Sequence, residues 1–311
     1  MRRRILRQLW ASTLIPMADQ FNNRLVFITG GSSGIGLALA KQFAARGANV
    51  WIAARRIDQL QDAQAQIRAA CQNAGQTVGI LQLDVADRDQ IAAVAAELLQ
   101  KAGTPDFVIN SAGVVQPGEF LKLEPEHFDW MMDINYLGTV FVTRAFLPAM
   151  LKRGSGHLVN ISSSAGFVGV YGYTGYSGSK FAVKGFTDAL RSEIKDCGIA
   201  VSLVCPPDTE TPQLEYDDLH KPPITRELSK TAGRMKADQV AEIILRGIQR
   251  RQYLIIPGFM NRLTYIASSL LGAAWYPLMD WMVRDARRTV GTANDKACQS
   301  DLDDPDQVGN Q

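Results

Sequence analysis

Residues 25–36 read LVFITGGSSGIG, an apolar run that passes through a glycine-rich turn into a segment with helical periodicity. Glycines let the chain turn tightly and bring backbone N–H groups close to a pyrophosphate, and the start of the following helix adds a favourable dipole. Glycine-rich turns are common, but between a strand and a helix this one indicates a dinucleotide site. We expect the ligands to be Gly30, Ser32, Ser33, Gly34 and Gly36.

The alternation of short apolar runs with helical segments continues to about residue 256. Candidate strands are residues 25–29, 49–53, 78–83, 107–110, 157–162, 200–205 and 253–256. Apolar strands that alternate with helices indicate a parallel sheet covered on both faces. We therefore predict an α/β fold in which residues 24–257 form one Rossmann-type, doubly wound sheet of about seven strands.

The end of the second predicted strand indicates which dinucleotide binds. An NAD site carries a ribose-binding carboxylate about 20 residues beyond the glycines. Here Ala54 stands in that region, followed by Arg55 and Arg56. Guanidinium groups suit a 2′-phosphate, so the sequence favours NADP(H) with both arginines as ligands. Asp58, the nearest acid, is interpreted as a helix cap.

A reactive pair follows the fifth predicted strand, in the segment NISSSAGFVGVYGYTGYSGSKFAVKGF (160–186). Tyr176 and Lys180 are four positions apart, so on a helix they share one face. A tyrosine has a pKa near 10, and an adjacent ammonium lowers it. Tyr171 and Tyr173 have no lysine at that spacing. The pattern therefore favours Tyr176 as an acid–base residue, the alternative being an exposed pair on an ordinary helix.

Several short motifs occur in an order that resembles the short-chain dehydrogenase/reductase family. They are TGGSSGIG (29–36), LDV (83–85), NSAG (110–113), Asn135, ISSSAG (161–166) and YSGSK (176–180). The resemblance covers about residues 24–256. It implies that Tyr176 exchanges a proton with the substrate oxygen, that Lys180 holds the nicotinamide ribose, and that Asn135 supports a water relay.

The same resemblance assigns one of three adjacent serines. In the family, the catalytic serine lies thirteen residues before the tyrosine, with glycines three and six positions after it, and Ser163 meets these conditions. Ser162 is then expected to end the strand, and Ser164 to be a spare loop donor. The family's adenosine-side contacts correspond to Asp84, Asn110 and Gly113, although Ser111 departs from the usual N-A-A-G or N-N-A-G.

Residues 205–212 read CPPDTETP, where most relatives have P-G-x-x-x-T. Pro206 and Pro207 stiffen this loop, which leaves Thr209 and Thr211 as its hydrogen-bonding groups toward the cofactor. Together with KPPITRELS (221–229) and the K-x-x-Q-V-A helix, the loop resembles 3-ketodihydrosphingosine (3-dehydrosphinganine) reductases. Those enzymes reduce 3-ketosphinganine to sphinganine with NADPH at the cytoplasmic face of a membrane.

This second resemblance implies a long-chain keto-lipid substrate. The acids Glu215, Asp217 and Asp218 are candidates to pair with its ammonium group, the alternative being that they are simply solvated. Two other functions remain open from the sequence. One is reduction of another lipophilic carbonyl, such as a steroid, retinal or 3-oxoacyl group, and the other is a non-catalytic NADPH-binding scaffold or sensor.

The two ends of the chain differ from the predicted domain. Residues 1–23 are basic, and residues 258–292 contain the apolar stretch LTYIASSLLGAAWYPLMDWMV (263–283). Its length nearly spans a hydrocarbon core, but Pro277 and Asp280 argue against a straight transmembrane helix. We expect a helix that lies on or re-enters a membrane, the alternative being a helix packed on the domain or on a second subunit. Residues 293–311 are polar and expected to be disordered.

Composition limits partners and compartment. The formal charge of +2 gives no argument for nucleic acid. The four cysteines are scattered without a C-x-x-C pair, which suits a reducing compartment, and the three histidines are too dispersed to indicate a metal site. The expectation is a membrane-associated enzyme with its catalytic domain in the cytoplasm, at the cytosolic face of the endoplasmic reticulum in a eukaryote. By resemblance to the family it is a homo-oligomer, a dimer or tetramer.

Overall fold

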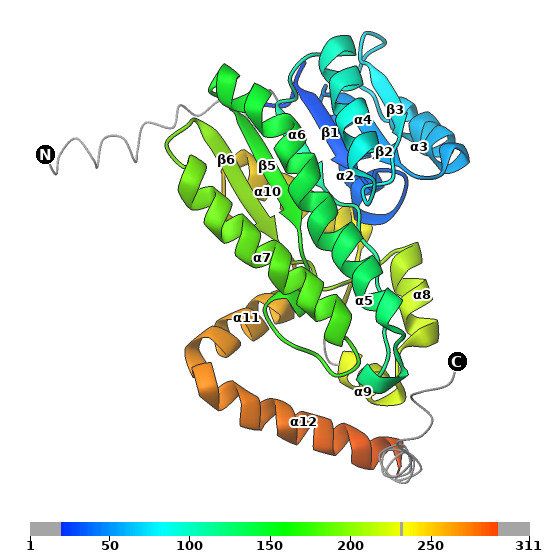
Figure 1. Cartoon of the computed structure of the whole chain (residues 1–311), viewed down its shortest axis with the longest axis vertical. Helices are drawn as coiled ribbons and strands as arrows, with labels where there is room; N and C mark the ends of the chain where they lie inside the picture. The colour runs from blue at the N-terminus through cyan, green and yellow to red at the C-terminus, as the bar shows by residue number, and fades with distance from the viewer. Residues whose placement is uncertain (1–19, 231–232, 292–311) are drawn as a thin grey trace, which may run out of the picture.

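A parallel sheet in the order β3-β2-β1-β4-β5-β6-β9 forms the centre of the computed structural model, which describes residues 20–230 and 233–291 (Figure 1). Its strands are β1 (Leu25–Thr29), β2 (Asn49–Ala54), β3 (Val78–Gln82), β4 (Phe107–Asn110), β5 (Gly156–Ile161), β6 (Ile199–Val204) and β9 (Leu254–Ile255). The strand order reverses between β1 and β4, and ligands of such sheets bind beyond the carboxyl ends of the strands at that point. The predicted seven-stranded Rossmann-type sheet is confirmed.

Helices cover both faces of the sheet. One core is formed with α2 (Gly34–Ala44), α3 (Ile57–Ala69) and α10 (Ala237–Gln249). The other is formed with α4 (Arg88–Lys101), α6 (Gly138–Arg153) and α7 (Thr174–Ile194). Within β1, Val26 and Ile28 belong to the first core and Leu25 and Phe27 to the second, because successive strand residues point to opposite faces. Continuous apolar strands are thus buried on both sides.

A second, two-stranded parallel sheet lies beyond the carboxyl edge and is not predicted by the sequence. It pairs β7 (Asp208–Glu210) with β8 (Arg234–Lys236). Between these strands lie α8 (Pro212–His220) and α9 (Pro223–Ser229). Helix α8 begins where it does because the Thr211 hydroxyl accepts a hydrogen bond from the N–H of Leu214 and Pro212 occupies the first turn.

Two smaller segments complete the described fold near the site. After β4 the chain forms the short helical turn η1 (Phe120–Lys122) and then α5 (Pro125–Met131). A π-helical turn, η2 (Met132–Leu137), joins α5 to α6. After β5 comes the 3-10 turn η3 (Ser164–Gly166). The strand β5 ends at Ile161, one residue earlier than predicted, although the Ser162 N–H still bonds the carbonyl of Val204 at 2.8 Å.

The C-terminal apolar segment folds as two helices rather than one. These are α11 (Phe259–Leu271) and α12 (Trp275–Val290), joined by the turn η4 (Gly272–Ala274), where Gly272 takes a φ of +51°. Figure 1 shows the pair, in orange, extending beyond the carboxyl edge of the sheet, with α12 running back toward α9. We call it the C-terminal arm.

The arm packs on the domain, as the alternative interpretation of this segment expects. The rings of Phe167 and Tyr265 lie 5.2 Å apart edge to face, and the Arg287 guanidinium lies 6.0 Å from the ring of Tyr171. Its helices of 13 and 16 residues are shorter than the roughly 20 that span a bilayer. Within the described residues, the stretch long and apolar enough to span is Pro125–Arg153, which folds as α5, η2 and α6. Of these, α6 packs on β4 and β5 of the sheet, and α5 packs against α7.

Two predicted segments fall outside the described ranges. Most of the basic segment 1–23 and all of the polar tail 293–311 lie there.

Candidate active site

The glycine-rich turn after β1 has room only for glycine at several positions. A Cβ on Gly36 would lie 2.2 Å from the carbonyl oxygen of Gly30, and one on Gly30 would lie 2.8 Å from the backbone of Ala112. Gly30 and Gly34 take φ values of +67° and +54°. The turn is therefore packed tightly against the loop that follows β4.

This turn presents an anion site to a large cavity. Gly30, Ser33, Gly34 and Gly36 line the cavity, whereas Ser32 does not. Ser33 precedes α2 without capping it through its side chain, so the first N–H groups of the helix have no internal acceptor. Free amides at a helix start suit a pyrophosphate. This part of the structure therefore fits the dinucleotide that the sequence predicts.

Arg55 and Arg56 lie just beyond the end of β2 and are exposed. Within the described residues neither guanidinium has a hydrogen bond or ion pair, so both are free to meet a 2′-phosphate. The capping role predicted for Asp58 is wrong, because α3 begins at Ile57 and Asp58 lies inside its first turn, with Arg56 in the cap position. Asp84 is half-buried, and its carboxylate accepts a hydrogen bond from the N–H of Ala86 at 3.0 Å.

Asn110 is the last residue of β4, and Gly113 lies in the loop that follows it. Gly113 lines the cavity. Asn110 is not among the residues that line it, and its buried Nδ2 donates to Thr143 Oγ1 at 3.0 Å and Asn160 Oδ1 at 2.8 Å. Asn160 in turn donates to Thr187 Oγ1 on α7 at 2.9 Å. The Asn110 side chain thus ties β4 to β5 and, through Asn160, to the helix that carries Tyr176.

Tyr176, Ser163 and Lys180 meet at the carboxyl edge of β5. The hydroxyls of Tyr176 and Ser163 are hydrogen-bonded, and both residues line the cavity. Lys180 Nζ donates to the carbonyl of Ile161 at 3.2 Å and lies 5.7 Å from the centre of the Tyr176 ring. Ser162 takes a structural role, since its hydroxyl donates to the Lys180 carbonyl at 2.9 Å.

Asn135 reaches this group from the π-helical turn η2. Its Oδ1 accepts from the N–H of Val114 at 2.8 Å, and its Nδ2 donates to the Val114 carbonyl and to Ser179 Oγ, both at 2.9 Å. A Cβ on Gly113 would lie 3.2 Å from Asn135 Oδ1 and 3.3 Å from Lys180 Nζ. Asn135 and Lys180 therefore both lie close to Gly113. Insertions of π geometry often occur at functional sites.

Burial sets the protonation of the reactive pair. Burial raises the pKa of Tyr176 to about 12, although the hydrogen bond with Ser163 acts in the opposite direction. Burial also lowers the pKa of Lys180 to about 8. The expected lowering of the tyrosine pKa by the ammonium is thus outweighed by burial in this structure. At neutral pH Tyr176 carries its proton and is ready to donate it.

The loop Cys205–Pro207 is fixed at one side of the cavity. The Pro206 carbonyl accepts from the N–H of Ser164 at 3.0 Å, and Thr209 donates its hydroxyl to the Pro207 carbonyl at 2.8 Å. Thr211 lies against the glycine turn, because a Cβ on Gly34 would come within 3.0 Å of its methyl group. Thr209 and Thr211 both line the cavity. The diproline loop therefore joins the dinucleotide side of the site to Ser163.

The cavity continues from Tyr176 into an apolar region. Its volume is about 540 Å³. Apolar residues from α8, α9 and the C-terminal arm line this part, namely Leu214, Leu228, Met260, Leu263, Ala267, Trp275, Met279 and Met282. The sequence places the arm at a membrane and does not predict this wall. An elongated apolar ligand would fit between the arm and Tyr176.

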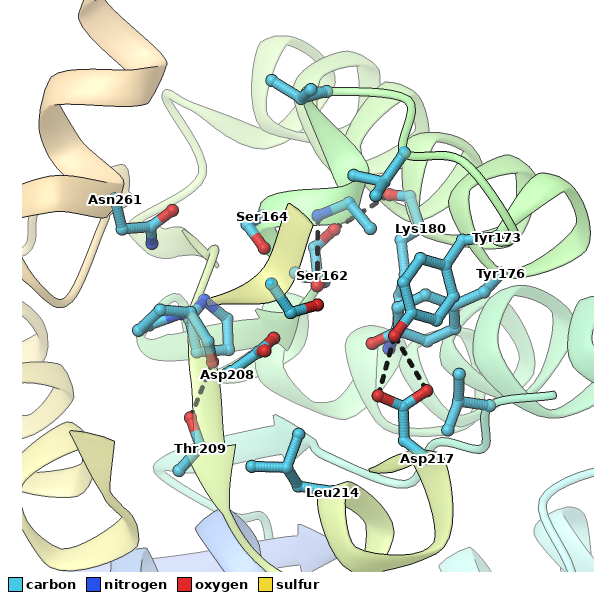
Figure 2. Close-up of a pocket in the computed structure, with 18 of the residues that line it drawn as sticks. Ser162, Ser164, Tyr173, Tyr176, Lys180, Asp208, Thr209, Leu214, Asp217 and Asn261 are labelled. Carbon is cyan, nitrogen blue, oxygen red and sulfur yellow. Dashed lines mark hydrogen bonds between the residues drawn. The ribbon is translucent and has the colours of Figure 1, made fainter. Parts of the chain in front are cut away.

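The three acids of α8 differ in their surroundings, and Figure 2 shows one of them, Asp217, beside Tyr173. Asp217 is buried in the cavity wall and accepts the Tyr173 hydroxyl at 2.7 and 2.9 Å from its two oxygens. Glu215 is exposed, and neither it nor Asp218 lines the cavity. Asp208, which no sequence pattern indicates, does line it. Asp208 and Asp217 are therefore the acids placed to meet a ligand.

Comparisons with known proteins agree with this arrangement. A family model described as short chain dehydrogenase matches residues 24–221. The chain is 38% identical over 232 residues to the 3-dehydrosphinganine reductase of Danio rerio, covering 74% of this chain and 70% of that protein. It is also 38% identical over 265 residues to the 3-dehydrosphinganine reductase TSC10B of Arabidopsis thaliana, covering 83% of this chain and 78% of that protein.

Solved structures that share this fold include one complex with NAD and one with NADPH. A short chain dehydrogenase/reductase from Burkholderia phymatum in complex with NAD aligns with a TM-score of 0.72 at 25% identity, covering 83% of this chain and 96% of that one. A short-chain dehydrogenase from Sphingobium yanoikuyae in complex with NADPH aligns with a TM-score of 0.68 at 28% identity, covering 83% and 95%. These neighbours support a nicotinamide cofactor, but they do not distinguish NADPH from NADH.

Proposed function

The chain belongs to the short-chain dehydrogenase/reductase family of NAD(P)-dependent oxidoreductases, and from this we propose that it reduces 3-ketosphinganine to sphinganine with NADPH. The observation that carries the proposal is the cavity, which is lined both by Ser163 and Tyr176 and by apolar residues of the C-terminal arm. A long-chain ketone needs both the hydroxyls for its carbonyl and the apolar residues for its alkyl chain. The names of the relatives supply the substrate class.

The cofactor would be held by the glycine turn, Gly113, Lys180 and the loop with Thr209 and Thr211. Bound there, a reduced nicotinamide supplies the hydride. NADPH is proposed over NADH because Arg55 and Arg56 are free of protein partners where the adenosine ribose is expected. Replacing both by alanine is expected to raise the KM for NADPH by about 10- to 100-fold, while the KM for NADH changes little. Equal effects on both KM values would exclude 2′-phosphate recognition.

Ser163 and Tyr176 would hold the ketone oxygen through their hydroxyls. As negative charge develops on that oxygen, Tyr176 gives up its proton, and Ser163 keeps its hydrogen bond to the oxygen. The buried ammonium of Lys180 stabilises the resulting tyrosinate. Asn135 fixes the loop through Val114 and the start of α7 through Ser179. The high pKa of Tyr176 suits reduction, because the donor must begin protonated.

The arm also supports the proposed membrane association. Large apolar side chains on it remain exposed, among them Phe259, Leu270, Tyr276 and Trp281. We propose that this outer face rests on a membrane with the catalytic domain in the cytoplasm, so that the lipid reaches the cavity along the arm. Flotation with liposomes tests it: Leu270→Glu should reduce binding, and unchanged binding would contradict it. We also propose a dimer or tetramer, which light scattering after gel filtration would measure.

A substrate panel tests the main proposal. The purified chain in detergent should oxidise NADPH with 3-ketosphinganine and release sphinganine, which mass spectrometry identifies. A steroid ketone, retinal and a 3-oxoacyl thioester should react at least tenfold more slowly. Faster turnover of any of these would replace the proposed substrate, and no turnover of any carbonyl would favour a binding role.

A further inference from the structure

Three carboxylates and two cations gather where β7, β8 and α8 meet beside the cavity. Lys221 Nζ lies 3.0 Å from a carboxylate oxygen of Asp217 and 2.8 Å from one of Asp218. Arg234 lies 2.8 Å from the other oxygen of Asp218. Both cations are therefore engaged with the acids of α8. Counting Asp208 as the third carboxylate, the group carries one negative charge in excess.

Asp208 is the carboxylate of this group that has no partner. Within residues 20–230 and 233–291, no hydrogen bond or ion pair is made by its side chain, whereas Asp217 is bonded to both Tyr173 and Lys221. Figure 2 shows Asp208 directed from its loop into the space between that loop and α8. A partly buried carboxylate without a counterion is costly, so its presence here requires an explanation.

The electrostatics around Asp208 agree with an unfilled cation position. Burial raises the pKa of Asp208, and the charges of Lys221 and Arg234 act in the opposite direction without cancelling that effect. Its charge also reaches the reacting hydroxyl, since Asp217 and Asp208 both raise the pKa of Tyr176. A cation bound beside Asp208 would remove both effects.

The position of Asp208 relative to the reacting atoms suggests which cation. Asp208 directly follows Pro207 in the loop that is anchored to Ser164, next to Ser163. A ketone oxygen held by Ser163 and Tyr176 would therefore bring the substrate alongside this loop. In 3-ketosphinganine one of the two carbons bonded to the carbonyl carries the ammonium group, and the other begins the alkyl chain.

We propose that Asp208 binds the ammonium of a 2-amino ketone, with Asp217 as the second negative charge, and so selects amino ketones over neutral long-chain ketones. This inference rests on the proposed function and deepens it. A neutral ketone of the same length gains no ion pair from Asp208, so the carboxylate favours the amino ketone while affecting the neutral ketone little. Asp208 is thus a specificity residue rather than a proton donor.

The test compares two ketones of one chain length, 3-ketosphinganine and octadecan-3-one, with the wild type, Asp208→Asn and Asp208→Glu. Asp208→Asn should lower kcat/KM for the amino ketone by about 10- to 100-fold, mostly through KM, because a charge-assisted hydrogen bond is lost. It should change kcat/KM for octadecan-3-one less than about threefold. Asp208→Glu should recover part of the loss.

Two controls keep the result specific. Glu215→Gln removes an exposed acid of the same segment that does not line the cavity, and it should leave both substrates unaffected. The KM for NADPH should stay constant in Asp208→Asn, which shows that the fold and the cofactor side are intact.

Two outcomes would overturn the inference alone. One is an equal loss with both ketones, which would indicate a structural role, and the other is wild-type kinetics of Asp208→Asn with 3-ketosphinganine. If the wild type fails to reduce 3-ketosphinganine but reduces other carbonyls, the proposed function and this inference both fall.

Discussion

The two walls of the cavity are held in different ways. The wall that carries Tyr176 is fixed by buried polar contacts, such as Asn110 to Asn160 and Asn160 to Thr187. The wall formed by the C-terminal arm is held by Asn261, which donates to the carbonyls of Cys205 and Pro257, and beyond it by ring and side-chain packing. Many of its apolar side chains stay exposed.

This difference separates chemistry from selection. Proton transfer needs atoms fixed to a few tenths of an ångström, and buried hydrogen bonds provide that. An alkyl chain needs only a continuous apolar surface, which flexible side chains such as those of Met279 and Met282 can adapt. We therefore expect changes in the first wall to alter kcat and changes in the second to alter KM for long chains.

The largest expected effect is that of Tyr176→Phe in the first wall. Removing the proposed proton donor should lower kcat by about 10²- to 10⁴-fold, while the dissociation constant of NADPH stays within about twofold. Stopped-flow absorbance and fluorescence titration measure the two quantities. Retained turnover would show that another group donates the proton, and it would contradict the assignment of catalysis to the wall that carries Tyr176.

The pH dependence of reduction should show the titration of Lys180. Burial lowers the pKa of Lys180 to about 8, so its ammonium is present below that pH and is lost as the pH rises through it. Because we propose that the ammonium stabilises the tyrosinate, kcat should fall above about pH 8, by up to about tenfold per unit. A profile that stays flat from pH 7 to 10 would contradict this role of the lysine.

The second wall should respond in KM. Met279→Ser removes apolar contact from the cavity, and at about 0.8 kcal/mol per buried methylene it should raise the KM for 3-ketosphinganine by roughly four- to tenfold. A short-chain amino ketone should show no change. Leu278→Ser, on the same helix but outside the cavity, is the matched control in detergent. A fall in kcat without a rise in KM would mean that the arm positions the reacting atoms.

The smallest expected effect on catalysis comes from Thr187→Val. This change removes the acceptor of Asn160 while keeping the shape of the side chain, and it should lower the free energy of unfolding by about 1–3 kcal/mol. Urea denaturation measures it, with kcat expected to stay within about threefold at 25 °C. Unchanged stability would show that the buried contacts of the first wall are not what holds it.

The first wall and the central sheet are largely predictable from the sequence because their signals are local. The turn at Gly30–Gly36, the spacing of Tyr176 and Lys180, and the apolar strands are each contained in one short stretch. Errors there are small: β5 ends at Ile161 instead of residue 162, and Asp58 lies inside a helix instead of capping it.

The second wall depends on contacts between residues far apart in the sequence. In the β7–β8 sheet, the backbone of Asp208 lies opposite that of Arg234. This strand pairing and the hydrogen bond from Tyr173 to Asp217 join segments that no local sequence pattern connects. The break at Gly272 turns one apolar stretch into two helices, which hydropathy alone does not distinguish from a single helix. The unpaired state of Asp208 follows only from where the two cations lie.

The most direct test of the proposed reaction follows the hydride itself. The wild type is incubated with 3-ketosphinganine and NADPH deuterated at the transferable position, and the lipid product is analysed by mass spectrometry. We predict sphinganine with one deuterium at its third carbon, and almost none from Tyr176→Phe. Oxidation of the cofactor without deuterated sphinganine, or an equal yield from Tyr176→Phe, would contradict the assignment.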